Sequence, residues 1–265
     1  TSFAQDDKST VYSMVERLYS PSTILVDTTD ANTLYLTLLN GISNGCSVTM
    51  SNKKNLVIPW KIAETFFTSP RVRFESTVCA GTPVVAMLRR LSNSLDEIYS
   101  VEGCLSGTLN YICSQLDDGT AMAKAVEDAH DFGYTEPDPR DDLNGMDVGR
   151  KALILARMAG WHLEMGDISI EKLYPDSLES VDKEDFIRKL NLLTPKYQQL
   201  AQHAAAEDMS LRYIGSITPK EGRCYMKAVS KNSEFGLLKG TANKVSVLSR
   251  VHNPIPLTVS GSGAG

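Results

Sequence analysis

The sequence predicts an α/β protein in which an incomplete, doubly wound parallel sheet is followed by an α+β region. Strands and helices alternate over residues 23–76 at the spacing typical of a doubly wound sheet. Helical segments then dominate residues 83–206, and consecutive strands follow over 211–251. A chain of 265 residues is long enough for one or two domains of this kind.

In the first part of the chain strands alternate with helices, beginning with a strand of β-branched and apolar residues at 23–27. Polar turns follow the first two strands at 27–30 and 51–53. Ligands of parallel sheets bind at the carboxyl ends of the strands, so we expect these turns to face a ligand. The expected helices here are 11–18, 32–39 and 59–67, and the expected strands are 23–27, 47–50 and 72–76.

The second part changes from helices to strands. Its last strands lie next to one another in sequence, which favours an antiparallel sheet. The exposed edges of such a sheet need covering, and pairing with a second copy of the chain would cover them. The expected helices are 83–94, 106–116, 121–131, 142–159, 183–192 and 195–206, and the expected strands are 98–102, 167–170, 211–217, 223–229, 244–251 and 255–259.

Composition and charge exclude several classes of function. With 42% hydrophobic and 22% charged residues, the chain has the composition of a soluble globular protein. Its net charge of −5 argues against nucleic-acid or anionic-membrane partners. It lacks an apolar run of about 20 residues that could span a bilayer. Its first ten residues are polar and unlike a signal peptide, so we expect a cytoplasmic protein, with an organellar stroma as the alternative.

The five cysteines form no CxxC pair, which argues against a metal knuckle or a redox motif. We expect them to be small, buried, reduced residues in a reducing compartment. The four histidines show no ligand spacing and are expected to be structural or surface residues.

The most informative run is 133–151, a loop with two prolines that leads into a helix. The prolines disfavour helix at the residues before them, so the loop should stay extended until Asp141 or Asp142 caps the helix. Asp147 and Lys151 are four residues apart and should share one helical face. The carboxylates of the loop are Glu136, Asp138, Asp141 and Asp142.

This density of carboxylates opposite a lysine suits a small, polar, zwitterionic substrate. The alternative is a capped surface helix with an ordinary Asp–Lys pair. No GxGxxG motif occurs on a βα unit near the start, and the terminal 261–265 is a weak match for a phosphate-binding loop.

The run 133–151 resembles the signature of the homoserine dehydrogenases. Three other segments resemble that family in the same order: 48–54 with its Asn–Lys pair, 75–83, and the Ser-Gly-Thr loop and helix at 103–112. The second of these departs from the family at Cys79 and Thr82. The terminal 260–265 resembles a late glycine-rich turn of the family, so the likeness covers nearly the whole chain.

The resemblance implies a reversible, NAD(P)-dependent interconversion of L-homoserine and L-aspartate 4-semialdehyde, on the pathway from aspartate to threonine and methionine. Lys151 matches the catalytic lysine, and Lys53 is a second lysine that shares this role. Burial must lower the pKa of Lys151 if it is to act as a base. The resemblance also implies that Asp147 positions the substrate hydroxyl or a water and that Glu136 binds the substrate ammonium group. Asp142 and the Thr108 hydroxyl would complete the polar shell, and Asp141 would cap the helix.

The resemblance also implies a cofactor site and a cation site. NAD or NADP would contact Thr28, Thr29, Asn52 and Lys53, with helix capping as the alternative role of the threonines. A monovalent cation, often sodium in the family, would lie near Glu75, Val78, Ala80 and Thr82 and bind largely to backbone oxygens. The alternative there is a plain buried turn between a strand and a helix.

Family members begin with a βαβ unit that bears the glycine-rich dinucleotide loop, and they continue past the terminal glycines into a helix. This chain has neither piece, so we expect a partial Rossmann-like nucleotide domain over 1–74, completed by 255–265. We expect a catalytic region over 83–207 and a dimerisation sheet from 75–82 and 208–254, giving a homodimer.

Two other readings remain open. A different semialdehyde dehydrogenase would need a nucleophilic cysteine, for which Cys79 and Cys104 are the candidates. A non-catalytic paralogue or assembly subunit would explain the missing dinucleotide loop. The joint presence of Glu136, Asp147 and Lys151 argues against such decay.

Overall fold

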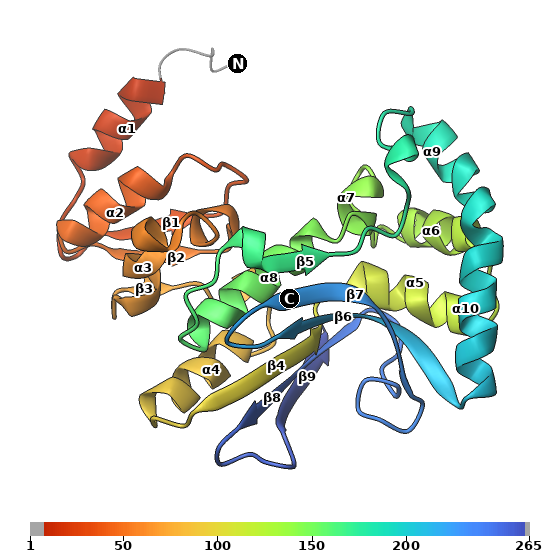
Figure 1. The fold of residues 1–265 in the computed structure, drawn as a ribbon. Helices are drawn as coiled ribbons and strands as arrows, with labels where there is room; N and C mark the ends of the chain where they lie inside the picture. The colour runs from red at the N-terminus through yellow and green to blue at the C-terminus, as the bar shows by residue number, and fades with distance from the viewer. Residues whose placement is uncertain (1–7, 263–265) are drawn as a thin grey trace. The chain divides into compact units, whose positions relative to one another are not determined.

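The computed structural model describes residues 8–262, with side chains from residue 12, and divides the chain after Thr77 into two compact units (Figure 1). Within the described residues, no helix has the length and apolar character needed to cross a membrane. The two units differ in architecture, as the change of pattern along the sequence predicts, and each is described by itself.

Unit 1 is a three-stranded parallel sheet with helices in its connections, ordered β1-β2-β3. The predicted strand 47–50 has the bounds of β2, whereas the third strand ends early because Glu75–Thr77 turns into a 3-10 helix. Val48, Phe66 and Val72 are fully or almost fully buried. The elements are α1 (Lys8–Glu16), β1 (Ile24–Asp27), α2 (Tyr35–Ser43), β2 (Ser47–Met50), α3 (Trp60–Thr68) and β3 (Val72–Arg73).

Unit 2 combines one sheet with seven α-helices in its described part. Of the longest helices, α5 and α10 lie close to the predicted bounds 106–116 and 195–206. Its helices are α4 (Val84–Asn93), α5 (Gly107–Asp117), α6 (Met122–Asp131), α7 (Arg140–Leu143), α8 (Met146–Met158), α9 (Lys183–Lys189) and α10 (Thr194–Ala206). Its strands are β4 (Ile98–Cys104), β5 (Ile168–Ile170), β6 (Met209–Ile217), β7 (Gly222–Ser230), β8 (Ala242–Ser249) and β9 (Leu257–Ser262).

The strand order of unit 2 is β5-β7-β6-β4-β8-β9, antiparallel except for the parallel pair β5–β7. Helices α5, α8 and α10 pack on the sheet, and α4 packs on α8 (Figure 1). The prediction that the last strand completes the nucleotide domain is wrong. β9 pairs with β8 from Val247↔Leu257 to Ala242↔Ser262, because the short connection 250–256 favours a neighbouring antiparallel strand.

The predicted single helix 142–159 is also wrong, since the structure breaks it into α7 and α8. Gly145 lies between them at φ 70°, in the left-handed region. A Cβ at Gly145 would lie 2.2 Å from the Tyr213 hydroxyl, so both the conformation and the close packing require glycine there. The break starts a new helix at Met146 and places Asp147 in its first turn.

Arg212 on β6 is the largest fully buried side chain among the described residues. Its guanidinium lies 2.7 Å from the Asp117 carboxylate and donates to the carbonyl oxygens of Phe235, Gly236 and Leu238. Asp117 also accepts the backbone N–H of Leu211 at 2.8 Å. These contacts hold the connection between β7 and β8 against the end of α5.

Candidate active site

Lys151 lies in α8, one turn beyond Asp147, and the predicted shared face is confirmed. Its Nζ is 2.7 Å from Asp147 Oδ2 and donates to the Leu105 carbonyl oxygen at 2.8 Å. The two bonds occupy two of the three donors of the ammonium group. The Lys151 side chain is 14% exposed, whereas that of Asp147 is 37% exposed. The ion pair therefore has one buried end and one that water or a ligand can reach.

The charge of Lys151 is set by two opposing effects. Burial by itself lowers its pKa, but the charge and hydrogen bond of Asp147 outweigh burial, and the net direction is upward. Lys151 is therefore an ammonium ion at neutral pH in this structure. The expectation that burial lowers this pKa is not met here, because carboxylates surround the ammonium.

The start of α5 brings a hydroxyl to the same place. Ser106 caps the helix by accepting the Leu109 N–H at 3.2 Å. Thr108 is buried and donates its hydroxyl to the Tyr134 carbonyl oxygen at 2.5 Å. Its hydroxyl also contacts the Asp142 carboxylate. Thr108 thus joins α5 to the acidic loop.

Asp142 is the organising carboxylate of that loop. Its Oδ2 accepts the backbone N–H of Glu136 at 2.8 Å, which folds the loop back over α7. Burial, with smaller contributions from the carboxylates of Glu136 and Asp147, raises the pKa of Asp142 to about 6 against the hydrogen bonds that it accepts. The structure therefore brings together the five residues expected to surround the substrate, which are Thr108, Glu136, Asp142, Asp147 and Lys151.

Two expectations for this loop are wrong. Neither Asp141 nor Asp142 caps a helix, because Pro139 holds the N-cap position of α7 and its side chain offers no acceptor. Asp141 is exposed instead, and the Asp142 carboxylate is engaged with Glu136. Asp138 instead accepts a backbone N–H at the start of α7, that of Arg140, at 3.0 Å.

The turn 78–82 contains two consecutive left-handed residues, Cys79 at φ 56° and Ala80 at φ 44°. Such backbone is costly for residues other than glycine. Cys79 is buried, and its thiol lies close enough to Lys151 and Asp147 for their charges to affect its pKa. The sequence pattern pointed to this turn but not to the thiol beside the lysine.

Both candidate nucleophilic cysteines are protonated at neutral pH. Burial raises the pKa of Cys79 to about 11 and that of Cys104 to about 12. Thiols in such surroundings are poor nucleophiles. All five cysteines are free and buried, as expected.

The four residues expected to bind a cation are divided between the units, with Glu75 in unit 1 and the others in the turn 78–82. Val78 and Thr82 are buried and Ala80 is half-buried. Carbonyl oxygens are a donor set that suits a hard cation. Side-chain groups of three or more His, Cys, Asp or Glu arranged for a metal do not occur among the described residues. A site of backbone oxygens stays a prediction.

At the strand ends of unit 1, Asp27 is the centre of a buried network that the sequence pattern did not single out. Its carboxylate accepts from the Thr29 N–H and hydroxyl, from Asn52 and from Asn55, at 2.8–3.1 Å. Asn52 also donates to the Ala31 carbonyl oxygen and accepts the Lys54 N–H. The side chains of Thr29 and Asn52 therefore shape the turns expected to carry the cofactor. Their contact with it stays a prediction.

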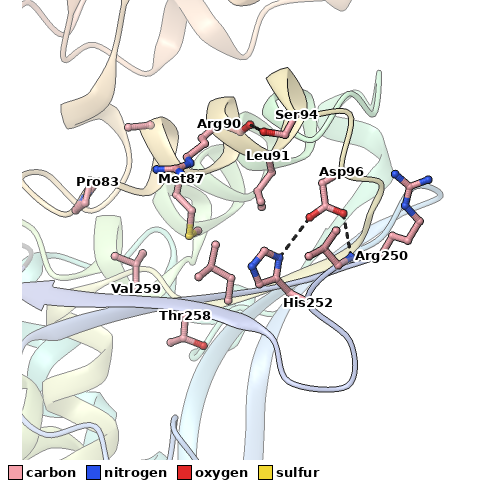
Figure 2. Close-up of a pocket in the computed structure, with 13 residues that line it drawn as sticks. Pro83, Met87, Arg90, Leu91, Ser94, Asp96, Arg250, His252, Thr258 and Val259 are labelled. Atoms are coloured by element: carbon pink, nitrogen blue, oxygen red, sulfur yellow. Dashed lines mark hydrogen bonds and ion pairs between the residues drawn. The ribbon is translucent and has the colours of Figure 1, made fainter.

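Unit 2 also has a cavity of about 720 Å³ between α4 and the segment from Arg250 to Val259 (Figure 2). His252 and Asp96 lie at one end of it, with 3.3 Å between His252 Nδ1 and Asp96 Oδ2. Its lining includes none of the residues around Lys151. This cavity and the candidate active site are therefore different places.

Sequence comparisons relate this arrangement to known proteins. The profile of the family described as homoserine dehydrogenase matches residues 83–265. The homoserine dehydrogenase of Paracoccidioides brasiliensis is 35% identical over 259 residues, which cover 91% of this chain and 70% of that protein. The bifunctional aspartokinase/homoserine dehydrogenase 1, chloroplastic, of Zea mays is 34% identical over 263 residues, or 96% of this chain. This chain spans 29% of the length of the maize protein.

Solved structures show the same fold. A protein of unknown function from Candida auris is 33% identical with a TM-score of 0.84, over 92% of this chain and 72% of that one. A hyperthermophilic archaeal homoserine dehydrogenase in complex with NADPH is 20% identical with a TM-score of 0.70, over 96% of this chain and 69% of that one.

Proposed function

The chain belongs to the homoserine dehydrogenase family, and from this premise we propose that it interconverts L-homoserine and L-aspartate 4-semialdehyde with NAD(P). The observation that carries the proposal is the Lys151–Asp147 ion pair beside Asp142 and Glu136. A largely buried ammonium group among carboxylates, one of which is accessible, suits a substrate with both a cationic amine and a reacting oxygen. In the pathway, this step lies between aspartate and the amino acids threonine and methionine.

The acidic loop is proposed to bind the amine of the substrate. Glu136 is exposed at the mouth of the site and supplies the carboxylate for the ammonium group. Asp142, held by the Glu136 N–H, and the Thr108 hydroxyl complete the polar shell. Charge-assisted hydrogen bonds of this kind are about twice as strong as neutral ones.

Lys151 is proposed to move the proton. Because its pKa is raised, it is ready to donate to the carbonyl oxygen as the semialdehyde is reduced to the alcohol. In the oxidative direction the same nitrogen, once it has lost its proton to solvent, accepts the hydroxyl proton, and Asp147 holds the ammonium that forms. Lys53 follows β2 in unit 1 and is the second candidate for this role.

A nicotinamide dinucleotide supplies or accepts the hydride when bound. Thr28, Thr29, Asn52 and Lys53 are proposed to contact it at the carboxyl ends of β1 and β2, where ligands of parallel sheets bind. The Asp27 network supports this proposal, because it gives both turns a defined shape. The archaeal structure of similar fold was solved with NADPH.

A homodimer through the sheet of unit 2 is proposed because β5 and β9 are edge strands of an open sheet, and pairing with a second copy of the chain would cover an edge. Light scattering at micromolar concentration should show two copies, and a monomer at that concentration would contradict the dimer.

A cytoplasmic or stromal location and a sodium ion at the turn 78–82 are proposed on the resemblance alone. Replacing sodium by lithium should lower activity if the cation binds.

The decisive test is the absorbance of reduced nicotinamide when the protein is mixed with NADP⁺ or NAD⁺ and L-homoserine. We expect reduction with homoserine and none with L-threonine, whose hydroxyl lies on a different carbon. Calorimetry of homoserine binding without cofactor tests the substrate shell separately. A protein that neither binds nor oxidises homoserine would contradict the proposed function and favour a non-catalytic paralogue.

A further inference from the structure

Arg140, at the start of α7, is the best-connected side chain of the acidic loop. Its Nε donates to both oxygens of Asp138 at 3.0 Å, and its Nη2 lies 2.6 Å from Asp138 Oδ2. Its Nη1 donates to the carbonyl oxygens of Glu179 and Val181, at 3.0 and 2.6 Å. The guanidinium carbon also lies 5.3 Å from the ring centre of Phe186. One side chain thus bridges two loops that are about 40 residues apart in sequence.

The second loop, 171–182, is itself held in place. Glu179 accepts from Lys172 Nζ at 2.7 Å and from the Tyr174 hydroxyl at 2.8 Å. Tyr197 on α10 donates its hydroxyl to the Leu173 carbonyl oxygen, and the Leu173 N–H donates to Leu143. Arg140 therefore ties the acidic loop to a segment anchored on α10 rather than to another free loop.

Arg140 and its partner Asp138 lie between the two carboxylates proposed to bind the substrate. Asp138 is two residues beyond Glu136, and Arg140 is two residues before Asp142. Between them Pro137 and Pro139 limit the backbone, and Lys183 Nζ donates to the Pro137 carbonyl oxygen at 3.3 Å. A planar guanidinium can satisfy Asp138 and two carbonyl groups at once, which an ammonium group on a flexible stem cannot reproduce.

We propose that Arg140 is a positioning residue for substrate binding: by clamping Asp138 to the Glu179 and Val181 carbonyl groups, it holds Glu136 and Asp142 in the geometry that receives the substrate ammonium. This inference rests on the proposed function of the site. Arg140 does not touch the reacting atoms, so its loss should act on the affinity for homoserine and leave proton transfer largely intact.

The kinetic test uses Arg140→Gln and Arg140→Lys in the whole protein. Both should raise the KM for homoserine by about tenfold or more, with kcat and the KM for NADP⁺ changed less than about threefold. Arg188→Gln is the matched control, because Arg188 on α9 is 73% exposed and pairs only locally with Asp185. A KM for homoserine within twofold of the parent in Arg140→Gln would overturn the proposal, as would equal losses in both KM values.

Hydrogen exchange separates this proposal from the proposed function, because it needs neither substrate nor turnover. In Arg140→Gln the amides of 134–142 should exchange at least about tenfold faster, while those of α8 stay protected. Unchanged exchange in the loop would overturn the clamp even in an active enzyme. If these amides exchange faster in Arg140→Gln but the protein does not bind homoserine, the role of Arg140 in holding the loop is upheld and the proposed substrate is contradicted.

Discussion

Unit 2 contains two buried cation–carboxylate pairs of equal length that differ in every other respect. Lys151 and Asp147 are 2.7 Å apart, as are Arg212 and Asp117. The Arg212 side chain is 1% exposed, and four backbone carbonyl groups accept its remaining donors. Lys151 has one such carbonyl group, and its aspartate partner is 37% exposed.

The difference separates an ion pair that holds the structure together from the pair proposed to take part in catalysis. A buried charge whose hydrogen bonds are all made inside the protein stabilises one conformation and has nothing left for a ligand. A charge that keeps a donor and an accessible partner can exchange a proton with a substrate. Substitutions at the two pairs should therefore separate activity from stability.

The largest effect is expected from Lys151. Lys151→Ala should lower kcat by roughly two to four orders of magnitude, the usual range for losing a general acid or base. Lys151→Arg should be nearly as damaging, because a guanidinium does not give up its proton. Both should unfold in urea close to the parent, since Asp147 can turn to water. Near-normal turnover of Lys151→Arg across alkaline pH would transfer the role to Lys53.

Arg212 should show the reverse behaviour. Arg212→Met leaves Asp117 and three carbonyl groups of the β7–β8 connection without their donor, so we expect a loss of about 3–5 kcal/mol in urea unfolding. The folded fraction should keep its kcat. The exposed Lys124, which pairs with Asp128 on α6, is the control, and Lys124→Met should unfold in urea close to the parent. A lower kcat in folded Arg212→Met would contradict the assignment of this pair to stability rather than activity.

A smaller effect is expected from Glu136, which acts through binding rather than proton transfer. Glu136→Ala should raise the KM for homoserine by roughly 10–100-fold with little change in kcat, because an ammonium partner contributes equally in ground and transition states. Initial rates over a range of homoserine concentrations measure both constants. An unchanged KM with slower turnover would show that Glu136 does not bind the ammonium group.

The smallest effect should be the pH dependence of Asp142. Its folded pKa of about 6 lies above its ordinary value of 3.8, so the folded state holds the proton more tightly than the unfolded one. The associated stability is present below about pH 3.8 and is lost as the pH rises through about 6. Asp142→Asn should therefore flatten the unfolding free energy between these values. A pH profile of Asp142→Asn that parallels the parent would show that another group titrates there.

Much of the fold could be predicted from local sequence. The β-branched run at 24–26, the exact bounds of β2 and the Ser106 cap of α5 depend on neighbours in the chain, so pattern and propensity suffice. The pairing of β9 with β8 follows from the short connection 250–256, although the family resemblance predicted that this strand would complete the nucleotide domain. The break at Gly145 depends on the Tyr213 hydroxyl, about 70 residues away in sequence.

For the site, the sequence by itself determined which side chains are available: the spacing of Asp147 and Lys151 along one helix, the acidic loop with its prolines, and Thr108 at a helix start. Only the tertiary structure decided their protonation states and which other groups hold them in position. The thiol of Cys79 beside the lysine and the clamp of Arg140 on Glu179 and Val181 join groups distant in the chain. Burial lowers the pKa of Lys151 while Asp147, one helical turn away, raises it, and burial raises the pKa of Asp142 to about 6. Burial and long-range hydrogen bonds set these properties, because both depend on what packs around a residue rather than on what precedes it.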